Sequence, residues 1–152
     1  MSHTASLTAT PFITSTTTTD VGSQSFIPPA FQPGFIPAAI GAAFAGGIYA
    51  GIIRGVDGSP DQHLVLVEGE GVDLSWSAAG AWAESVGGSL PTRAEQALLF
   101  ANLKDQFKSD WYWSGTQAGP SHAWGQDFDY GGQNDDHRSY EGRARAVRRL
   151  PI

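Results

Sequence analysis

The chain has 152 residues, with nine Lys and Arg against fifteen Asp and Glu, and a formal net charge of −6 at pH 7. That length fits one domain with an appendage, and the acidic balance argues against capture of nucleic acid or anionic lipid by charge. The chain has no cysteine, which excludes disulfides, cysteine-ligated zinc and cysteine nucleophiles. Five Trp, eight Phe and four Tyr, with nineteen Gly, predict an aromatic core connected by tight turns.

Charge divides the chain into two parts. Residues 1–53 contain a single charged side chain, Asp20, and all other charges lie between Arg54 and Arg149. Residues 2–33 are rich in Ser, Thr and Pro, a composition that cannot bury a core of its own. We expect residues 1–46 to form an extended attachment arm and residues 47–152 to form the folded domain. The apolar side chains expected at contacts with other subunits or proteins are Phe26, Phe31, Phe35, Ile36, Ile40 and Phe44.

Residues 34–53 form an uncharged stretch about as long as a membrane span. Pro37 and five glycines interrupt it, and no Lys or Arg precedes it to set an orientation. This pattern favours a segment covered by protein, so no membrane span is predicted.

From residue 47 onwards the pattern is typical of a compact mixed domain. Residues 48–53 and 63–68 predict two strands of a hairpin, joined by turn residues at 56–60. Asp73 or Ser75 is placed to cap a helix that ends at Gly87-Gly88. The apolar residues at helical spacing in it are Trp76, Ala79, Ala83 and Val86.

Thr92 and Glu95 have the spacing of a capping box and predict the start of a second helix. Its apolar face consists of Leu98, Leu99 and Leu103. Helical periodicity ends near Phe107. Short strands are then expected at residues 111–114, 123–130 and 143–150, separated by Gly-rich loops at 115–122 and 131–142. The prediction is an α+β fold with two helices, short antiparallel strands and long loops.

Three stretches resemble a known family. The sequence WAESVGGSLPTRAE at 82–95 resembles the G-x-x-L-P-T-x-x-E stretch of the formylglycine-generating-enzyme-like branch of the C-type lectin fold. WYWSGT at 111–116 resembles its Y-W-S-[SG]-T strand, and ARAVRR at 144–149 its closing V-R-x-V-R strand. The chain is thus similar to small lectin-fold proteins of tailed phages and prophages, and more distantly to the major tropism determinant of a Bordetella phage. The resemblance implies a C-type-lectin-like domain over residues 47–152.

Departures from that family decide what chemistry is expected. Its sulfatase-activating members need cysteines, its iron enzymes need a His-rich motif, and its sugar-binding lectins hold calcium through motifs that this chain lacks. No catalytic residue, metal or cofactor is therefore predicted. A calcium site remains an alternative to solvated loop carboxylates, and its ligands would come from Asp127, Asp129, Asp135 and Asp136. His137 beside Asp136 lacks a paired serine or cysteine motif for a triad.

Two groups of residues are assigned structural roles. Arg143 and Arg145 share a strand face and are expected to point to solvent, paired with Glu141 or Asp127. The tryptophans expected to pack in the core are Trp111, Trp113 and Trp124.

The Gly-rich region from 115 to 142 carries the residues that binding loops favour. The predicted ligand-binding residues are Tyr112, Gln117, Gln126, Tyr130, Asn134, Asp135, Asp136, His137 and Arg138. The alternative is that these loops are only a solvated cap.

Together these features predict a phage virion surface protein, not an enzyme, that decorates the head as a minor capsid protein or binds the host surface. It would be a homotrimer held to other virion proteins by its arm, with a host glycan or protein as a further partner. A tail-fibre or tail-tip receptor-binding protein is the alternative, and a degenerate lectin-fold enzyme is less favoured.

Overall fold

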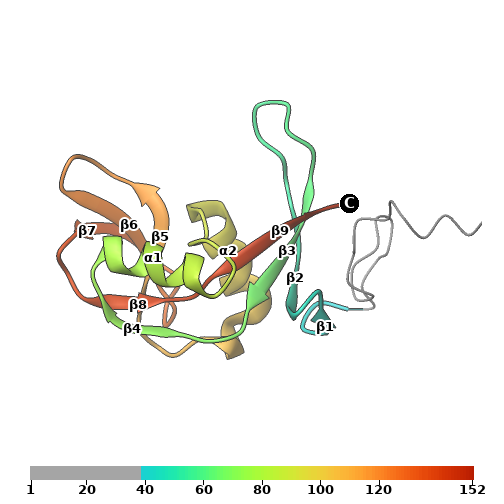
Figure 1. Ribbon diagram of the computed structural model, residues 1–152, viewed down its shortest axis with the longest axis horizontal. Coiled ribbons are helices and arrows are strands. Elements are labelled where there is room, and N and C mark those ends of the chain that lie inside the picture. The colour runs from blue at the N-terminus through green and yellow to red at the C-terminus, as the bar shows by residue number, and fades with distance from the viewer. Residues whose placement is uncertain (1–38) are drawn as a thin grey trace, which may run out of the picture.

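The computed structural model describes residues 39–152, which fold into two β-sheets and two α-helices (Figure 1). The first sheet is antiparallel and has the strand order β1-β2-β3-β9. Its strands are β1 (Ala43–Phe44), β2 (Gly47–Ile53), β3 (Gln62–Val67) and β9 (Val147–Pro151). The β2–β3 hairpin is the predicted one, and its tip extends away from the rest of the domain in Figure 1.

The second sheet has the order β4-β8-β5-β6-β7 and contains one parallel pair, β5 with β8. Its strands are β4 (Gly71–Leu74), β8 (Gly142–Ala144), β5 (Trp111–Gln117), β6 (His122–Asp127) and β7 (Gln133–His137). A register shift between Trp113 and Gln117 interrupts the pairing of β5 with β6.

Both predicted helices are confirmed, and local capping explains where each begins. Helix α1 (Trp76–Ser85) starts after Ser75, whose side chain accepts a hydrogen bond from the Ala78 N–H. Helix α2 (Arg93–Leu103) starts after Thr92, whose hydroxyl accepts from the Glu95 N–H at 3.2 Å. A short 3-10 helix, η1 (Lys104–Gln106), follows α2.

The two helices pack on opposite faces of strand β5. Tyr112 and Trp113 are adjacent in β5, so their side chains point to opposite faces, and both are buried. Tyr112 shares a core cluster with residues of α2, β2 and β3, whereas Trp113 shares one with Ala79 and Ala83 of α1. Helix α2 therefore lies between the two sheets, and α1 covers the outer face of the second sheet.

The predicted fold class is wrong. Nine strands in two sheets dominate the described residues, and the two helices are only ten and eleven residues long, so the fold is β-rich rather than the α+β lectin-like arrangement expected. The prediction failed in part because not every strand carries an alternating apolar pattern. The clearest case is β7, within the predicted loop 131–142, which is polar throughout and forms by backbone pairing with β6.

The N-terminal part of the described chain belongs to the folded domain. Strand β1 pairs with β2, and Phe44 is 4% exposed beside Tyr49 and Val65. Phe44 was expected at a contact between subunits, but its side chain is part of the core. Ile40 is half exposed. The remaining predicted arm contacts lie outside the described residues, namely Phe26, Phe31, Phe35 and Ile36. No helix among residues 39–152 is long and apolar enough to cross a membrane.

Candidate binding groove

The predicted binding residues do not form one surface. The β6–β7 hairpin pairs His122 with His137 at one end and Gln126 with Gln133 at the other, where the turn carries Tyr130. A five-residue strand such as β7 is roughly 15 Å long, so Tyr130 is far from His137 and Arg138. Tyr130 is 87% exposed. Exposed residues between or near these ends are Gln117, Asn134, Asp135 and Asp136.

Tyr112 and Gln126 are buried, which corrects their assignment to a ligand site. The Tyr112 hydroxyl donates to Glu70 at 2.9 Å and accepts from the Lys108 N–H at 3.1 Å. Gln126 donates from its side-chain amide to the Gln96 carbonyl oxygen at 3.3 Å. Both side chains therefore hold the core together beneath the hairpin.

Of the predicted binding residues, Arg138 lines a groove along α1. The groove has a volume of about 530 Å³ and lies along α1, facing the segment between α1 and α2, strand β5 and the residue that follows β7. Its lining residues are Trp76, Ser77, Gly80, Ala81, Glu84, Ser89, Leu90, Gly115 and Arg138.

Trp76 and Arg138 are held together at one end of this groove. The Arg138 guanidinium carbon lies 4.6 Å from the centre of the Trp76 ring, a cation–π arrangement. The Trp76 N–H donates to the Arg138 carbonyl oxygen at 3.0 Å, and the indole N–H donates to the Ser114 carbonyl oxygen at 2.8 Å. Two of these contacts fix the indole and the third fixes the Trp76 backbone, so this wall of the groove is formed before any ligand arrives.

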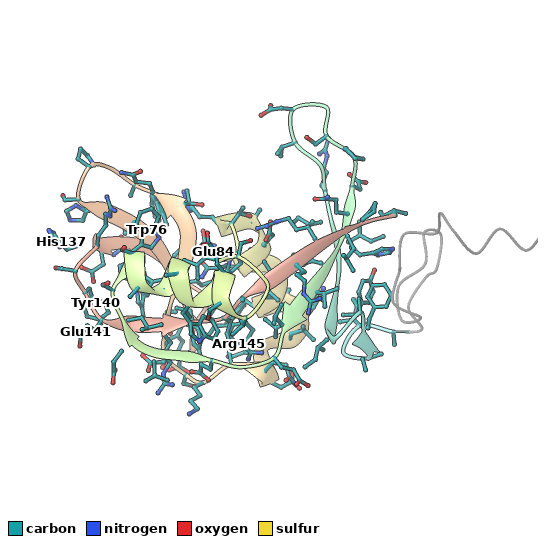
Figure 2. The ribbon with its side chains drawn as sticks, in the orientation of Figure 1. Trp76, Glu84, His137, Tyr140, Glu141 and Arg145 are labelled. Atoms are coloured by element: carbon teal, nitrogen blue, oxygen red, sulfur yellow. The ribbon has the colours of Figure 1, made fainter. Side chains whose placement is uncertain are left out.

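The groove carries one charge of each sign. Arg138 donates to the Pro120 carbonyl oxygen at 3.3 Å, but it makes no ion pair with any described residue. Glu84 is exposed on α1 and likewise makes no ion pair within residues 39–152. Figure 2 shows Trp76 and Glu84 toward opposite ends of α1. The charges of Arg138 and Glu84 are therefore accessible to a ligand.

Other arginines near the C-terminus are engaged by the protein itself, and the expected partners were wrong. Arg143 pairs with Glu70 and Asp110, each at 2.6 Å, rather than with Glu141 or Asp127. Arg145 was expected to point to solvent but is 7% exposed, and its guanidinium donates to the Gln106 and Val67 carbonyl oxygens. Desolvation by burial lowers the Arg145 pKa from its ordinary value.

A histidine pair lies beside the Arg138 end of the groove. His122 and His137 face each other across β6 and β7, with ring centres 5.5 Å apart. The ring Nδ1 of His137 lies 2.6 Å from the Ser139 hydroxyl and also accepts from the Ser139 N–H. Asp136 accepts from the backbone N–H of His137 rather than from its ring. This arrangement is a local turn and differs from a triad, in which a carboxylate orients the imidazole.

Of the predicted core tryptophans, Trp113 is fully buried, while Trp111 and Trp124 are partly buried. Trp124 lies under the Arg93 guanidinium, whose carbon is 3.6 Å from the ring centre. The aspartates that could have formed a calcium site remain apart from any larger cluster: residues 39–152 contain no group of three or more His, Asp or Glu side chains placed to hold a metal ion.

Sequence reasoning found Arg138 but missed the rest of the groove. Trp76 was interpreted as a core residue of the helix, and Glu84 carried no signal beyond an exposed helical position. The four α1 residues of the lining that follow Trp76 have the spacing i, i+3, i+4 and i+7, which places them on one helix face. That face is Ser77, Gly80, Ala81 and Glu84, and its small, polar composition could have marked it as an open surface.

No protein-family model matches the chain, and no curated protein matches it either.

Proposed function

We propose that the protein is a binding module displayed on the surface of a tailed-phage particle, with the α1 groove as its ligand-binding face. One observation carries the binding role: Arg138 and Glu84 line the same groove, on a rigid frame, without ion-pair partners among the described residues. Arg138 is half-buried, and a partly buried charge costs free energy unless it is paired or meets a ligand, whereas the exposed Glu84 supplies a carboxylate open to solvent.

The particle location is supported by sequence. Three stretches resemble proteins of tailed phages, and residues 1–38, outside the described part, hold the Ser, Thr and Pro residues expected of an attachment arm. The arm would fix the protein to other virion proteins, as a trimer, and leave the groove facing outward. In this proposal the protein binds and does not catalyse.

The location is tested by gold-labelled antibody against the full chain, applied to particles purified from cells that carry its gene. Label on the head supports the decoration role, and label on the tail supports the tail-fibre or tail-tip role. Absence of label from intact particles, with the protein present in the same lysate, would contradict the proposal.

The binding role is tested with the fluorescent full chain added to the host cells of the same phage. The parent protein should label the cells, and R138Q should lower the label. R54Q is the matched control because Arg54 is exposed and lies at the β2–β3 hairpin, outside the groove. Equal labelling by parent, R138Q and E84Q would remove the groove from the proposed function.

A further inference from the structure

We infer that the α1 groove takes a segment of polypeptide that carries an acidic and a basic side chain a few residues apart. This inference rests on the proposed function of the groove and names the class of its ligand. The observation behind it is the charge arrangement: the Arg138 guanidinium lies over the Trp76 ring. Trp76 and Glu84 lie toward opposite ends of α1 (Figure 2).

The distance between the two charged ends follows from helix geometry. Trp76 and Glu84 are eight positions apart in α1, which corresponds to about 12 Å along the helix axis. An extended peptide rises about 3.3 Å per residue and its side chains alternate between two faces, so residues four positions apart span about that length on the same face. A ligand side chain of each sign can then reach its partner at the same time.

Glu84 disfavours ligands that carry negative charges and no positive charge. A nucleic acid or an acidic polysaccharide would bring a row of anions along the groove and place one of them near the Glu84 carboxylate. Like charges brought together cost free energy, and that cost excludes wrong partners. Polypeptides commonly carry both signs within a few residues, so they satisfy Arg138 and Glu84 together.

The groove floor allows close approach of a peptide backbone. Gly80 on α1 has open space where a side chain would begin, with nothing within 4 Å. Gly115 is exposed on β5, and its backbone N–H is bonded to the Pro91 carbonyl oxygen at 2.8 Å, which fixes the opposite wall. Ser77 adds an exposed hydroxyl for hydrogen bonding with a peptide amide.

The test is selection of a displayed library of random short peptides on the immobilised full chain. The enriched peptides should carry an acidic and a basic residue four positions apart. Selection on R138Q should lose the preference for the acidic residue, and selection on E84Q the preference for the basic one. D57N and R54Q are matched controls, because both residues are exposed at the β2–β3 hairpin, and they should give the parent pattern.

Affinity measurement completes the test. For a synthetic peptide from the enriched set, R138Q and E84Q should each weaken binding roughly tenfold. Enriched peptides without this charge pattern, or with a pattern that both groove variants leave unchanged, would overturn the inference. A polyuronate or neutral oligosaccharide that binds the parent and not R138Q would also overturn it, while leaving the proposed binding function in place.

Discussion

Two arginines in the last part of the chain have opposite surroundings. Arg149 on β9 donates to both carboxylate oxygens of Glu95, at 2.7 and 2.8 Å, and to the Ser89 hydroxyl at 2.7 Å. Arg138 lies over the Trp76 ring and has no carboxylate partner among the described residues. The Arg149 guanidinium binds a carboxylate and so joins β9 to α2, whereas the Arg138 guanidinium remains open to a ligand.

This difference shows why charge alone does not mark a site. The Glu95 side chain is 4% exposed, so its carboxylate needs Arg149 to offset the loss of hydration. Arg138 is held by a ring and a carbonyl oxygen, which do not neutralise it. Ser89 connects the two arginines: its hydroxyl accepts a hydrogen bond from Arg149, and the residue also lines the groove that contains Arg138. The paired arginine thus holds one residue of the groove that the open arginine also lines.

The largest effect is expected for the core beneath both arginines. Trp113 is fully buried, and its indole N–H donates to the Leu74 carbonyl oxygen at 2.9 Å. W113A should lower the free energy of unfolding by about 3–5 kcal/mol, because a large cavity opens under α1. Urea denaturation, monitored by circular dichroism, measures this loss in the free energy of unfolding. A loss below about 1 kcal/mol would show that Trp113 does not support this layer.

The next effect concerns the paired arginine. R149A removes both hydrogen bonds to the Glu95 carboxylate and leaves that buried group without a partner. We expect a loss of about 2–4 kcal/mol in the free energy of unfolding, since removal of one partner from a buried pair is costly. The double variant R149A/E95A should recover part of this loss in the same measurement. A double variant less stable than R149A would contradict the pairing argument.

Tyr112 is expected to have a smaller effect, with a distinctive pH dependence. Burial raises the pKa of Tyr112 from 10.0 to about 12. The neutral phenol is favoured in the folded state, so its contribution to stability is complete below pH 10 and is lost as the pH rises from 10 toward 12. Y112F should cost about 1 kcal/mol at neutral pH through its lost hydrogen bonds.

The alkaline range separates this prediction from a simple packing defect. The unfolding free energy of Y112F should fall less steeply than that of the parent between pH 10 and 12, because no phenol remains at this position to ionise on unfolding. Parallel profiles for variant and parent, measured by urea denaturation at each pH, would contradict the role assigned to the buried hydroxyl.

The open arginine should matter little for stability. R138Q removes the cation–π contact with Trp76 and is expected to cost about 0.5–1 kcal/mol of unfolding free energy, while binding at the groove weakens roughly tenfold. R93Q is a matched control because Arg93 makes a similar contact with Trp124 outside the groove. R93Q should therefore retain binding. A stability loss for R138Q as large as that for R149A would make Arg138 a structural residue.

The smallest effect is expected at Asp110, which is paired but half exposed. A hydrogen bond from the Arg143 side chain, and a second from the Trp111 N–H, lower the Asp110 pKa from its ordinary 3.8. The stability that follows is present above the ordinary carboxyl pKa and is lost as the pH falls through the lowered value. D110N should therefore lose less stability than the parent below about pH 4 in acid titration monitored by fluorescence. Identical acid transitions would contradict this pairing.

Helices and the first hairpin could be predicted from the sequence because their signals are local. Ser75 and Thr92 each cap a helix. The side-chain oxygen of each accepts a hydrogen bond from the backbone N–H three residues further along the chain. The second half of the capping box gives way to a tertiary contact, since the Glu95 carboxylate binds Arg149 instead. Strand β7 could not be predicted, because its pairing depends on β6 and its side chains are polar.

Only part of the candidate site could be predicted from the sequence, because the rest depends on contacts between distant segments. Loop composition singled out the region of Arg138, but the predicted binding residues also included Tyr112 and Gln126, whose burial depends on α2 packing over that face of the sheet. Trp76 and Arg138 are distant in sequence, and their contact arises where the start of α1 meets the end of the β6–β7 hairpin.

The sequence by itself determined the elements whose causes are local: two capped helices, the hairpin of β2 and β3, and an aromatic core. The tertiary structure decided which charges remain available. Arg143 and Arg149 meet carboxylates from distant segments, and Arg138 meets a tryptophan ring instead. Pairing of charges depends on distances of a few ångströms between segments far apart in the chain, and neither composition nor periodicity encodes those distances.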